Sequence, residues 1–257
     1  MILAGIDAGS RTTKAVLWDD DRQNVLASGV VDQGIEQRGL ARALFERLLD
    51  EAGIDAGQVR ATVATGYGRN LLDFAKTTIT EITCHGRGVS HWHPETRTIV
   101  EIGGQDSKLI RLQAPGVIRD FAMNDRCAAG TGRFLEMVST RLDLSVTALG
   151  DLARESRGPT PISSMCVVFA ETEIIGLMAD GRRPADIVAG VQQAVANRVA
   201  AMAGRVVEPP VRFTGGVALI SGMAAALQAA LGHPVTVARE PMLTGALGAA
   251  LLAAKLA

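Results

Sequence analysis

Two stretches of this chain, GIDAGSRTTKAVLW (Gly5 to Trp18) and EIGGQDSKLIRL (Glu101 to Leu112), follow one plan. Each contains an apolar strand, a turn with glycine, an acidic residue and a lysine that leads into the next strand. A local pattern that recurs far along the chain is typical of a duplicated structural unit. We therefore predict two copies of one α/β unit.

Around the first stretch, the hydrophobic pattern predicts a meander of three short strands followed by a helix and a fourth strand. Leucines at helical spacing mark the helix, and Gly53 is expected to end it. The predicted elements are strands at Ile2 to Ile6, Lys14 to Trp18 and Val25 to Val31, a helix with Leu40, Leu44 and Leu48, and a strand near Val59 to Ala64.

The same order begins again near residue 97. The predicted elements are strands at 98–102, 108–112, 117–122, 211–214 and 235–237, and helices at about 128–142, 221–231 and 243–256. We predict one half over residues 1–96 and a second over 97–257. The second half carries a mostly helical insertion at about 143–205.

Composition and charge exclude several classes of protein. The 26 basic and 27 acidic side chains give a net charge of -1, which does not favour a nucleic-acid or anionic-lipid surface. The N-terminal residues lack the pattern of a signal peptide, and polar residues interrupt the most apolar later stretches. We expect a cytoplasmic protein whose three cysteines are free thiols or metal ligands.

Three glycine-containing turns are candidates for binding the phosphates of a nucleotide, because glycine lets backbone N–H groups approach an anion closely. Neither GxxxxGK[ST] nor GxGxxG occurs, so a Walker-type or Rossmann site is not indicated. The candidate binding residues are Gly9, Ser10, Arg11, Thr12, Thr13 and Lys14 in the first turn, Gly103 and Gly104 in the second, and Gly215 and Gly216 in the third.

Asp7, Gln105 and Asp106 are the candidate catalytic residues. The two aspartates would hold Mg²⁺ largely through water, since this ion prefers octahedral oxygen ligands and keeps several waters. Lys14 would face phosphate oxygens. Together the three turns resemble the phosphate-one, phosphate-two and adenosine motifs of the superfamily that contains actin, sugar kinases and the heat-shock chaperone ATPase domain. That resemblance implies two ribonuclease-H-like halves with nucleotide between them.

Cys127 and Cys166 each precede a segment that is predicted to be helical. A helix N-terminus favours a thiolate, because its N–H groups are unpaired and its dipole is positive there. A [4Fe-4S] cluster usually takes four thiolates, so two per chain suffice only if a two-fold homodimer shares one cluster. Zinc suits the same four sulfurs, and the residues alone do not separate the two metals.

Eight motifs in order over nearly the whole chain resemble the activator of 2-hydroxyacyl-CoA dehydratases, a family that includes the ATPase subunits of benzoyl-CoA reductase. They are GIDAGS, ATGYGRN, ITCHGRG, IGGQDSK, MNDRCAAGTGRFLE, ISSMCVVFAETE, FTGGVA and TGALGAAL. The resemblance implies a homodimeric ATPase with one bridging [4Fe-4S] cluster, whose ligands fall on Cys127 and Cys166. Arg11 and Met165 depart from the residue types that are usual at their positions.

The resemblance also implies a function. Ferredoxin or flavodoxin would supply an electron, ATP hydrolysis to ADP would drive it, and a partner dehydratase or acyl-CoA reductase with an iron-sulfur centre would receive it. A benzoyl-CoA reductase ATPase subunit is one alternative. A small-molecule kinase with structural cysteines is another, although Gln105 stands where a catalytic base would be needed. A nucleotide-dependent regulator with interface zinc is a third.

Other titratable residues have simpler interpretations. Cys84 is expected to be a buried structural thiol on a short helix. His91, His93 and His233 are expected on the surface or in loops. Glu171 and Glu173 are two residues apart on one predicted helix, so they do not share a face and cannot form a carboxylate pair for acid–base catalysis.

Overall fold

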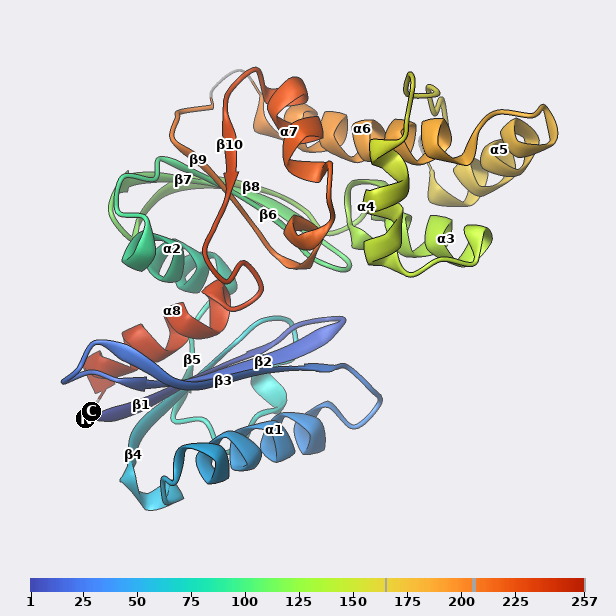
Figure 1. The fold of residues 1–257 in the computed structure, drawn as a ribbon. Helices are drawn as coiled ribbons and strands as arrows, with labels where there is room; N and C mark the ends of the chain where they lie inside the picture. Colours follow the sequence, from blue (N-terminus) through green and yellow to red (C-terminus); the bar gives the residue numbers. More distant parts are fainter. Residues whose placement is uncertain (165, 205–206, 257) are drawn as a thin grey trace. The chain divides into compact units, whose positions relative to one another are not determined.

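The computed structural model describes residues 1–164, 166–204 and 207–256. These form two compact units, whose elements are drawn in Figure 1. The first unit contains Met1–Thr96, Leu112–Arg119 and Met242–Ala257, and the second contains Arg97–Arg111 and Asp120–Pro241. Two stretches that follow residue 97 in the chain therefore belong to the first unit.

The sheet of the first unit has the strand order β3-β2-β1-β4-β5. Strand β2 pairs antiparallel with β1 and β3, whereas β4 pairs parallel with β1 and β5. Parallel neighbours need a crossover, and the long stretch between β3 and β4 supplies it. The strands are β1 (Ile2–Ala8), β2 (Thr12–Asp19), β3 (Asn24–Asp32), β4 (Val59–Thr65) and β5 (Thr77–Thr78).

The second sheet repeats this arrangement with the order β10-β9-β6-β7-β8. Strand β6 pairs antiparallel with β7 and parallel with β9, just as β1 pairs with β2 and β4. The strands are β6 (Thr98–Ile102), β7 (Ser107–Ala114), β8 (Val117–Asn124), β9 (Val211–Thr214) and β10 (Val235–Val237). The predicted duplicated ribonuclease-H-like α/β fold is confirmed.

Helices cover both faces of the first sheet. The helices are α1 (Gln37–Ala52), α2 (Glu81–Trp92) and α8 (Thr244–Ala253), with 3₁₀ turns η1 (Ala56–Gln58), η2 (Arg69–Leu71) and η5 (Ala254–Leu256). On one face, Leu44 and Leu48 of α1 are buried with Ile6 of β1. On the other face, Leu247 of α8 is buried with Leu3. Since successive side chains of a strand point to opposite faces, β1 contributes to both cores.

Glycine lets α8 pack unusually close to its neighbours. A Cβ at Gly5 of β1 would lie 2.0 Å from the carbonyl oxygen of Ala246, and one at Gly248 would lie 1.8 Å from that of Cys84. Neither contact leaves room for a side chain. Gly53, with φ of 65°, ends α1 in the left-handed conformation, as predicted.

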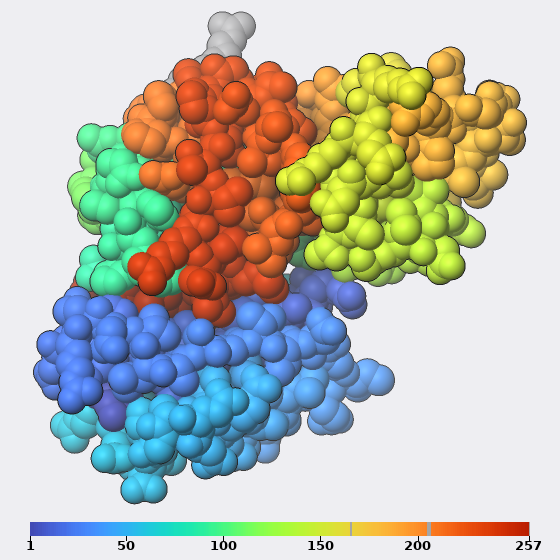
Figure 2. Space-filling view, in the orientation of Figure 1, coloured from blue at the N-terminus to red at the C-terminus, as the bar shows by residue number. Residues whose placement is uncertain are grey.

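The second unit contains the helical insertion, which lies between β8 and β9. Its elements are η3 (Ala128–Gly130), α3 (Gly132–Leu142), α4 (Val146–Arg154), α5 (Val167–Ala179) and α6 (Pro184–Ala203), followed by η4 (Gly216–Leu219) and α7 (Met223–Leu231). Val188, Val191, Val195 and Val199 of α6 are fully buried at helical spacing. Helices α3, α4 and α5 contribute to the yellow-green to amber surface in Figure 2.

One predicted helix is wrong in its first residues. We expected a single helix from about 128 to 142, but the chain forms the short turn η3 and then begins α3 at Gly132. Thr131 separates the two because its hydroxyl donates to the oxygen of Ala128 (2.8 Å) and accepts from the amide of Arg133 (3.3 Å). A threonine with these local bonds caps a new helix and interrupts the preceding one.

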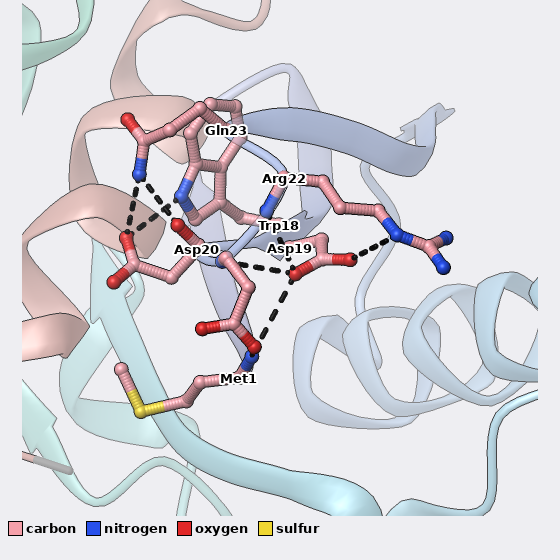
Figure 3. Close-up of polar contacts among 7 residues, drawn as sticks. Met1, Trp18, Asp19, Asp20, Arg22 and Gln23 are labelled. Atoms are coloured by element: carbon pink, nitrogen blue, oxygen red, sulfur yellow. Dashed lines mark hydrogen bonds and ion pairs between the residues drawn. The ribbon is translucent and has the colours of Figure 1, made fainter.

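Figure 3 shows how the acidic turn between β2 and β3 is held. Asp19 accepts hydrogen bonds from the amides of Asp21 (3.0 Å) and Arg22 (3.3 Å). The amino group of Met1 pairs with Asp21 and lies 3.6 Å from Asp19. A hydrogen bond to Asp21 raises the pKa of this amino group above its usual value. The start of β1 is thereby attached to the turn that follows β2.

In the parts of the chain that the structure describes, no helix is long and apolar enough to cross a lipid bilayer.

Candidate functional site

The predicted phosphate-one turn joins β1 to β2, and the end of β3 supports it. The amide of Gly9 donates to the oxygen of Thr12 (3.1 Å), which closes the turn. Gln33 donates from Nε2 to the oxygen of Gly9 (2.8 Å) and from its amide to the oxygen of Arg11 (2.8 Å). The hydroxyl of Thr13 donates to Oε1 of Gln33 (3.1 Å). Gln33 thus fixes a turn whose sequence motif does not include it.

Asp7 lies at the end of β1 beside this turn and is 6% exposed. Its Oδ2 is 3.5 Å from Nζ of Lys14. Two glycines from other elements border the same carboxylate: a Cβ at Gly66 would lie 2.3 Å from Oδ1, and one at Gly245 would lie 3.1 Å from Oδ2. Both glycines therefore pack closely against the carboxylate, and a side chain at Gly66 would collide with it.

The remaining residues of the phosphate-one turn differ in exposure. Arg11 is exposed, Ser10 and Thr12 are half-buried, and Thr13 is buried. A Cβ at Gly9 would lie 2.9 Å from the oxygen of Thr12 and 3.1 Å from Nζ of Lys14. Glycine is required there for the close approach.

The predicted phosphate-two turn joins β6 to β7 and surrounds a buried lysine. Lys108 is 2% exposed, and its Nζ lies 2.9 Å from Oε2 of Glu101 and 2.8 Å from Oδ2 of Asp106. The amide of Gly103 donates to the oxygen of Asp106 (3.0 Å). Gln105 projects at the exposed tip of the turn, beside the half-buried Gly104. A buried charge needs paired partners, and the two carboxylates supply them.

The predicted adenosine turn lies against Glu101, the partner of Lys108. Gly215 has φ of +91°, and a Cβ there would lie 2.3 Å from the oxygen of Ile102 and 2.7 Å from Oε1 of Glu101. Its amide donates to the oxygen of Pro241 (3.0 Å), whereas Gly216 has open space where a side chain would be. Parallel pairing of Glu101 with Thr214 brings the two turns together. The second unit therefore joins the phosphate-two and adenosine turns at Glu101.

Glu101 is not among the candidate residues that the sequence predicted. In the antiparallel register, Glu101 lies opposite Lys108 just as Asp7 lies opposite Lys14. The duplicated unit thus places an acid–lysine pair at the same position in both sheets. Aligning the two repeats on their lysines, rather than on the glycines, would have revealed it.

Cys127 is held by its own loop in the second unit. Asn124 Nδ2 donates to the oxygen of Cys127 (2.7 Å), and the amide of Cys127 donates to Oδ1 of Asn124 (3.0 Å). Nη1 of Arg198, on α6, lies 4.0 Å from the sulfur. Cys127 precedes η3 and not an α-helix, so our assignment of it to an α-helix N-terminus is wrong.

Cys166 is the N-cap residue of α5, at a helix start as predicted, and it is exposed. The loop before it is attached to α5 by Glu173, which accepts from the amide and hydroxyl of Ser163 and from the amide of Ser164, all at 2.8 Å. Burial raises the pKa of the Glu173 carboxyl, but these hydrogen bonds outweigh that effect and lower it to about 2. Met165, which we singled out in the sequence, lies outside the described residues.

Glu171 and Glu173 serve different partners, in agreement with their predicted separation on the helix. Glu171 pairs with Arg141 of α3, which joins α5 to α3.

The segment after Cys127 is hydrogen-bonded directly to the phosphate-two turn. The amides of Gly132 and Arg133, at the start of α3, donate to the oxygens of Gly103 and Gly104, both at 2.9 Å. Gly132 is buried, and a Cβ there would lie 3.0 Å from the oxygen of Gly103. The cysteine loop and a predicted phosphate-binding turn are therefore connected within one unit by backbone hydrogen bonds.

Cys84 is buried on α2 in the first unit, and burial raises the pKa of its thiol to about 12. The prediction of a structural thiol is confirmed. Among the described residues, no group of three or more His, Cys, Asp or Glu side chains is arranged to hold a metal ion. Within one chain, Cys127 and Cys166 are thus the thiols that are accessible to a metal.

Residues 4–253 of this chain match the BadF/BadG/BcrA/BcrD ATPase family. The chain belongs to this ATPase family. The match covers both sheets, all three glycine turns and both accessible cysteines, so it concerns the whole chain and not one motif.

Relatives in the BadF/BadG/BcrA/BcrD family have named activities. The 2-hydroxyisocaproyl-CoA dehydratase activator of Clostridioides difficile is 40% identical over 98% of this chain and 95% of its own length. The (R)-2-hydroxyglutaryl-CoA dehydratase activating ATPase of Acidaminococcus fermentans is 40% identical over 98% and 96%. A subunit of the benzoyl-CoA reductase of Thauera aromatica is 32% identical over 97% and 92%.

A solved structure of the family agrees with the fold. The activator of the 2-hydroxyisocaproyl-CoA dehydratase from Clostridium difficile, with bound ADPNP, has a TM-score of 0.94 and 39% sequence identity to this chain. The similarity covers 100% of this chain and 95% of the other.

Proposed function

We propose that this chain is an ATP-driven activator that delivers single low-potential electrons to a 2-hydroxyacyl-CoA dehydratase. One arrangement carries the proposal: the loop of Cys127 is continuous with the start of α3, whose amides bond to the phosphate-two turn. A nucleotide-dependent movement of that turn would reach a metal-ligating cysteine after a few residues. Similarity over the whole chain to two dehydratase activators supports the class of partner.

Nucleotide binding is assigned to the three glycine turns. Asp7 and Asp106 would hold Mg²⁺ largely through water, and Lys14 would contact phosphate oxygens. The residues that would contact the nucleotide are Gly9, Ser10, Arg11, Thr12 and Thr13 in the first turn, Gly103 and Gly104 in the second, and Gly215 and Gly216 in the third. Gln105, exposed at the tip of its turn, would orient the attacking water.

The donor set fits half of an iron-sulfur site. Cys127 is half-buried and Cys166 exposed, and both belong to the second unit. Two copies of the chain around a two-fold axis would supply four thiolates, the usual set for a [4Fe-4S] cluster. When bound, such a cluster takes up and releases one electron at low potential. The exposed Val168 (68%) and Phe169 (70%) beside Cys166 would be covered by the second copy.

ATP is needed because the electron must be made more reducing. Lowering a one-electron potential by ~300 mV requires ~7 kcal/mol, since ~59 mV equals a tenfold change in the equilibrium constant. We propose ferredoxin or flavodoxin as the source of the electron. The acceptor would use it to form a ketyl radical from a 2-hydroxyacyl-CoA, which then loses water.

A second candidate is the ATPase subunit of a benzoyl-CoA reductase, which the 32% identity to the reductase subunit from Thauera aromatica favours. The two functions share the nucleotide and the cysteines, so they differ only in the partner. Electron transfer from this chain to each purified partner, followed under anaerobic conditions, would discriminate between them.

The proposal is tested by anaerobic purification with iron and acid-labile sulfide assays and electron paramagnetic resonance (EPR). We expect about two irons per chain, four being shared by two copies. Cys127→Ser and Cys166→Ser should each lose iron and electron transfer and still bind an ATP analogue. Cys84→Ala is the matched control and should keep the iron, because Cys84 is buried in the other unit. Iron retained in both serine variants would refute the assignment.

A further inference from the structure

Asn124 and Arg198 contact Cys127 in different ways. Asn124 hydrogen-bonds to the backbone amide and carbonyl of Cys127, so it fixes the backbone and does not contact the sulfur through these bonds. Arg198 approaches the sulfur itself, with Nη1 at 4.0 Å. The exposed neighbours Asp125 and Arg126 lie 4.0 Å from each other, so their opposite charges largely cancel and water screens them.

The position of Arg198 is fixed because its helix packs into the core of the second unit. It lies on α6, between the buried residues Val195 and Val199. Its own backbone is close to the cysteine loop, since a Cβ at Gly130 would lie 3.4 Å from Cβ of Arg198. The guanidinium is permanently charged, because arginine does not lose its proton in proteins. A half-buried charge near the sulfur is screened less than an exposed one.

We infer that Arg198 sets the reduction potential at Cys127, as a positioning residue that supplies a fixed positive charge. This inference rests on the proposed function, in which Cys127 ligates an iron-sulfur cluster. An added electron makes such a centre more negative, so a nearby cation stabilises the reduced form. Arg198 therefore makes it easier for the external reductant to load the electron, and the nucleotide must act against that preference when the electron leaves.

The test is a redox titration of the iron-loaded dimer, monitored by EPR, for Arg198→Gln and Arg198→Lys. Arg198→Gln should hold a full complement of iron, and its reduction equilibrium should become at least about tenfold less favourable, a shift of ~59 mV toward negative potential. Arg198→Lys should restore most of the wild-type value because it keeps the charge. Arg154→Gln, which removes an exposed arginine of α4, is the matched control and should not shift the potential.

Each other outcome has one meaning. An unchanged potential in fully loaded Arg198→Gln would overturn the role of Arg198 and leave the proposed function intact. Loss of iron in Arg198→Gln would also overturn the inference, because Arg198 would then be needed to hold the metal and not to set its potential. Wild-type protein purified without iron or sulfide would refute the proposed function itself, and the inference with it.

Discussion

Substituting Gly132 by alanine should disturb the connection between the phosphate-two turn and the cysteine loop. The new Cβ would lie 3.0 Å from the oxygen of Gly103, 3.3 Å from Cα of Gly104 and 3.3 Å from Cγ2 of Val217. Two of these are backbone atoms, which cannot rotate away as a flexible side chain can. The turn and the start of α3 must therefore separate by a few tenths of an ångström.

The cost can be worked from general magnitudes. Overpacking a buried site costs about 1–3 kcal/mol, and weakening two backbone hydrogen bonds removes part of about 1 kcal/mol each. Alanine offsets at most about 1 kcal/mol through its better helix propensity. We expect a net loss of about 1–3 kcal/mol in the free energy of unfolding. If ~1.4 kcal/mol of it falls on the nucleotide-bound state, the Kd of an ATP analogue rises tenfold.

The assay combines urea denaturation, calorimetric titration with an ATP analogue, and EPR of the iron-loaded protein with and without nucleotide. Gly39→Ala is the matched control, because Gly39 lies in the first turn of α1 and its nearest atom would be 4.0 Å away. The variant Gly132→Ala should keep its iron and lose the nucleotide-dependent change of the EPR signal. A stability equal to that of Gly39→Ala, with an unaltered response to nucleotide, would refute the reasoning.

Three more outcomes follow from the structure. Lys108→Met should lower the free energy of unfolding by about 3–5 kcal/mol, because it removes the lysine that pairs with the buried Glu101. The double variant Glu101→Gln/Lys108→Met should recover much of that loss in urea denaturation. Equal stability of the single and double variants would contradict the pairing. In metal-free protein at pH 8, iodoacetamide should modify Cys166 quickly and Cys84 only after unfolding, since the Cys84 thiol has a pKa of about 12. Peptide mass spectrometry reads the labelling, and rapid labelling of Cys84 in the folded protein would argue against its burial. The pKa of Glu173 is depressed from 4.5 to about 2, so the carboxylate stabilises the folded state above pH 4.5 and this stabilisation is lost as the pH falls toward 2. Glu173→Gln should lower the free energy of unfolding at pH 7 by less than about 1 kcal/mol, because solvent screens the group. In this variant, hydrogen exchange at the amides of Ser163 and Ser164 should depend on pH between 5 and 2 only through the intrinsic exchange rate.

The sequence by itself determined the fold class and the order of elements. Strand alternation, the leucine stripe of α1 and the stop at Gly53 are local signals, and the strands that these signals predicted lie within a few residues of their expected positions. The repeat of strand, glycine turn and lysine also sufficed to reveal the duplication, because the same local geometry imposes the same residue types in both copies.

Local signals failed where a residue's role depends on a distant partner. Thr131 ended η3 and began α3 through bonds that compete with a continuous helix, which periodicity does not register. Glu101 joined the phosphate-two and adenosine turns only because β6 and β9 pair in parallel across more than a hundred residues. Gln33, Glu173 and Arg198 reached their partners through side chains that extend from other elements. Sequence spacing records which side chains share a face, whereas tertiary packing decides which faces meet.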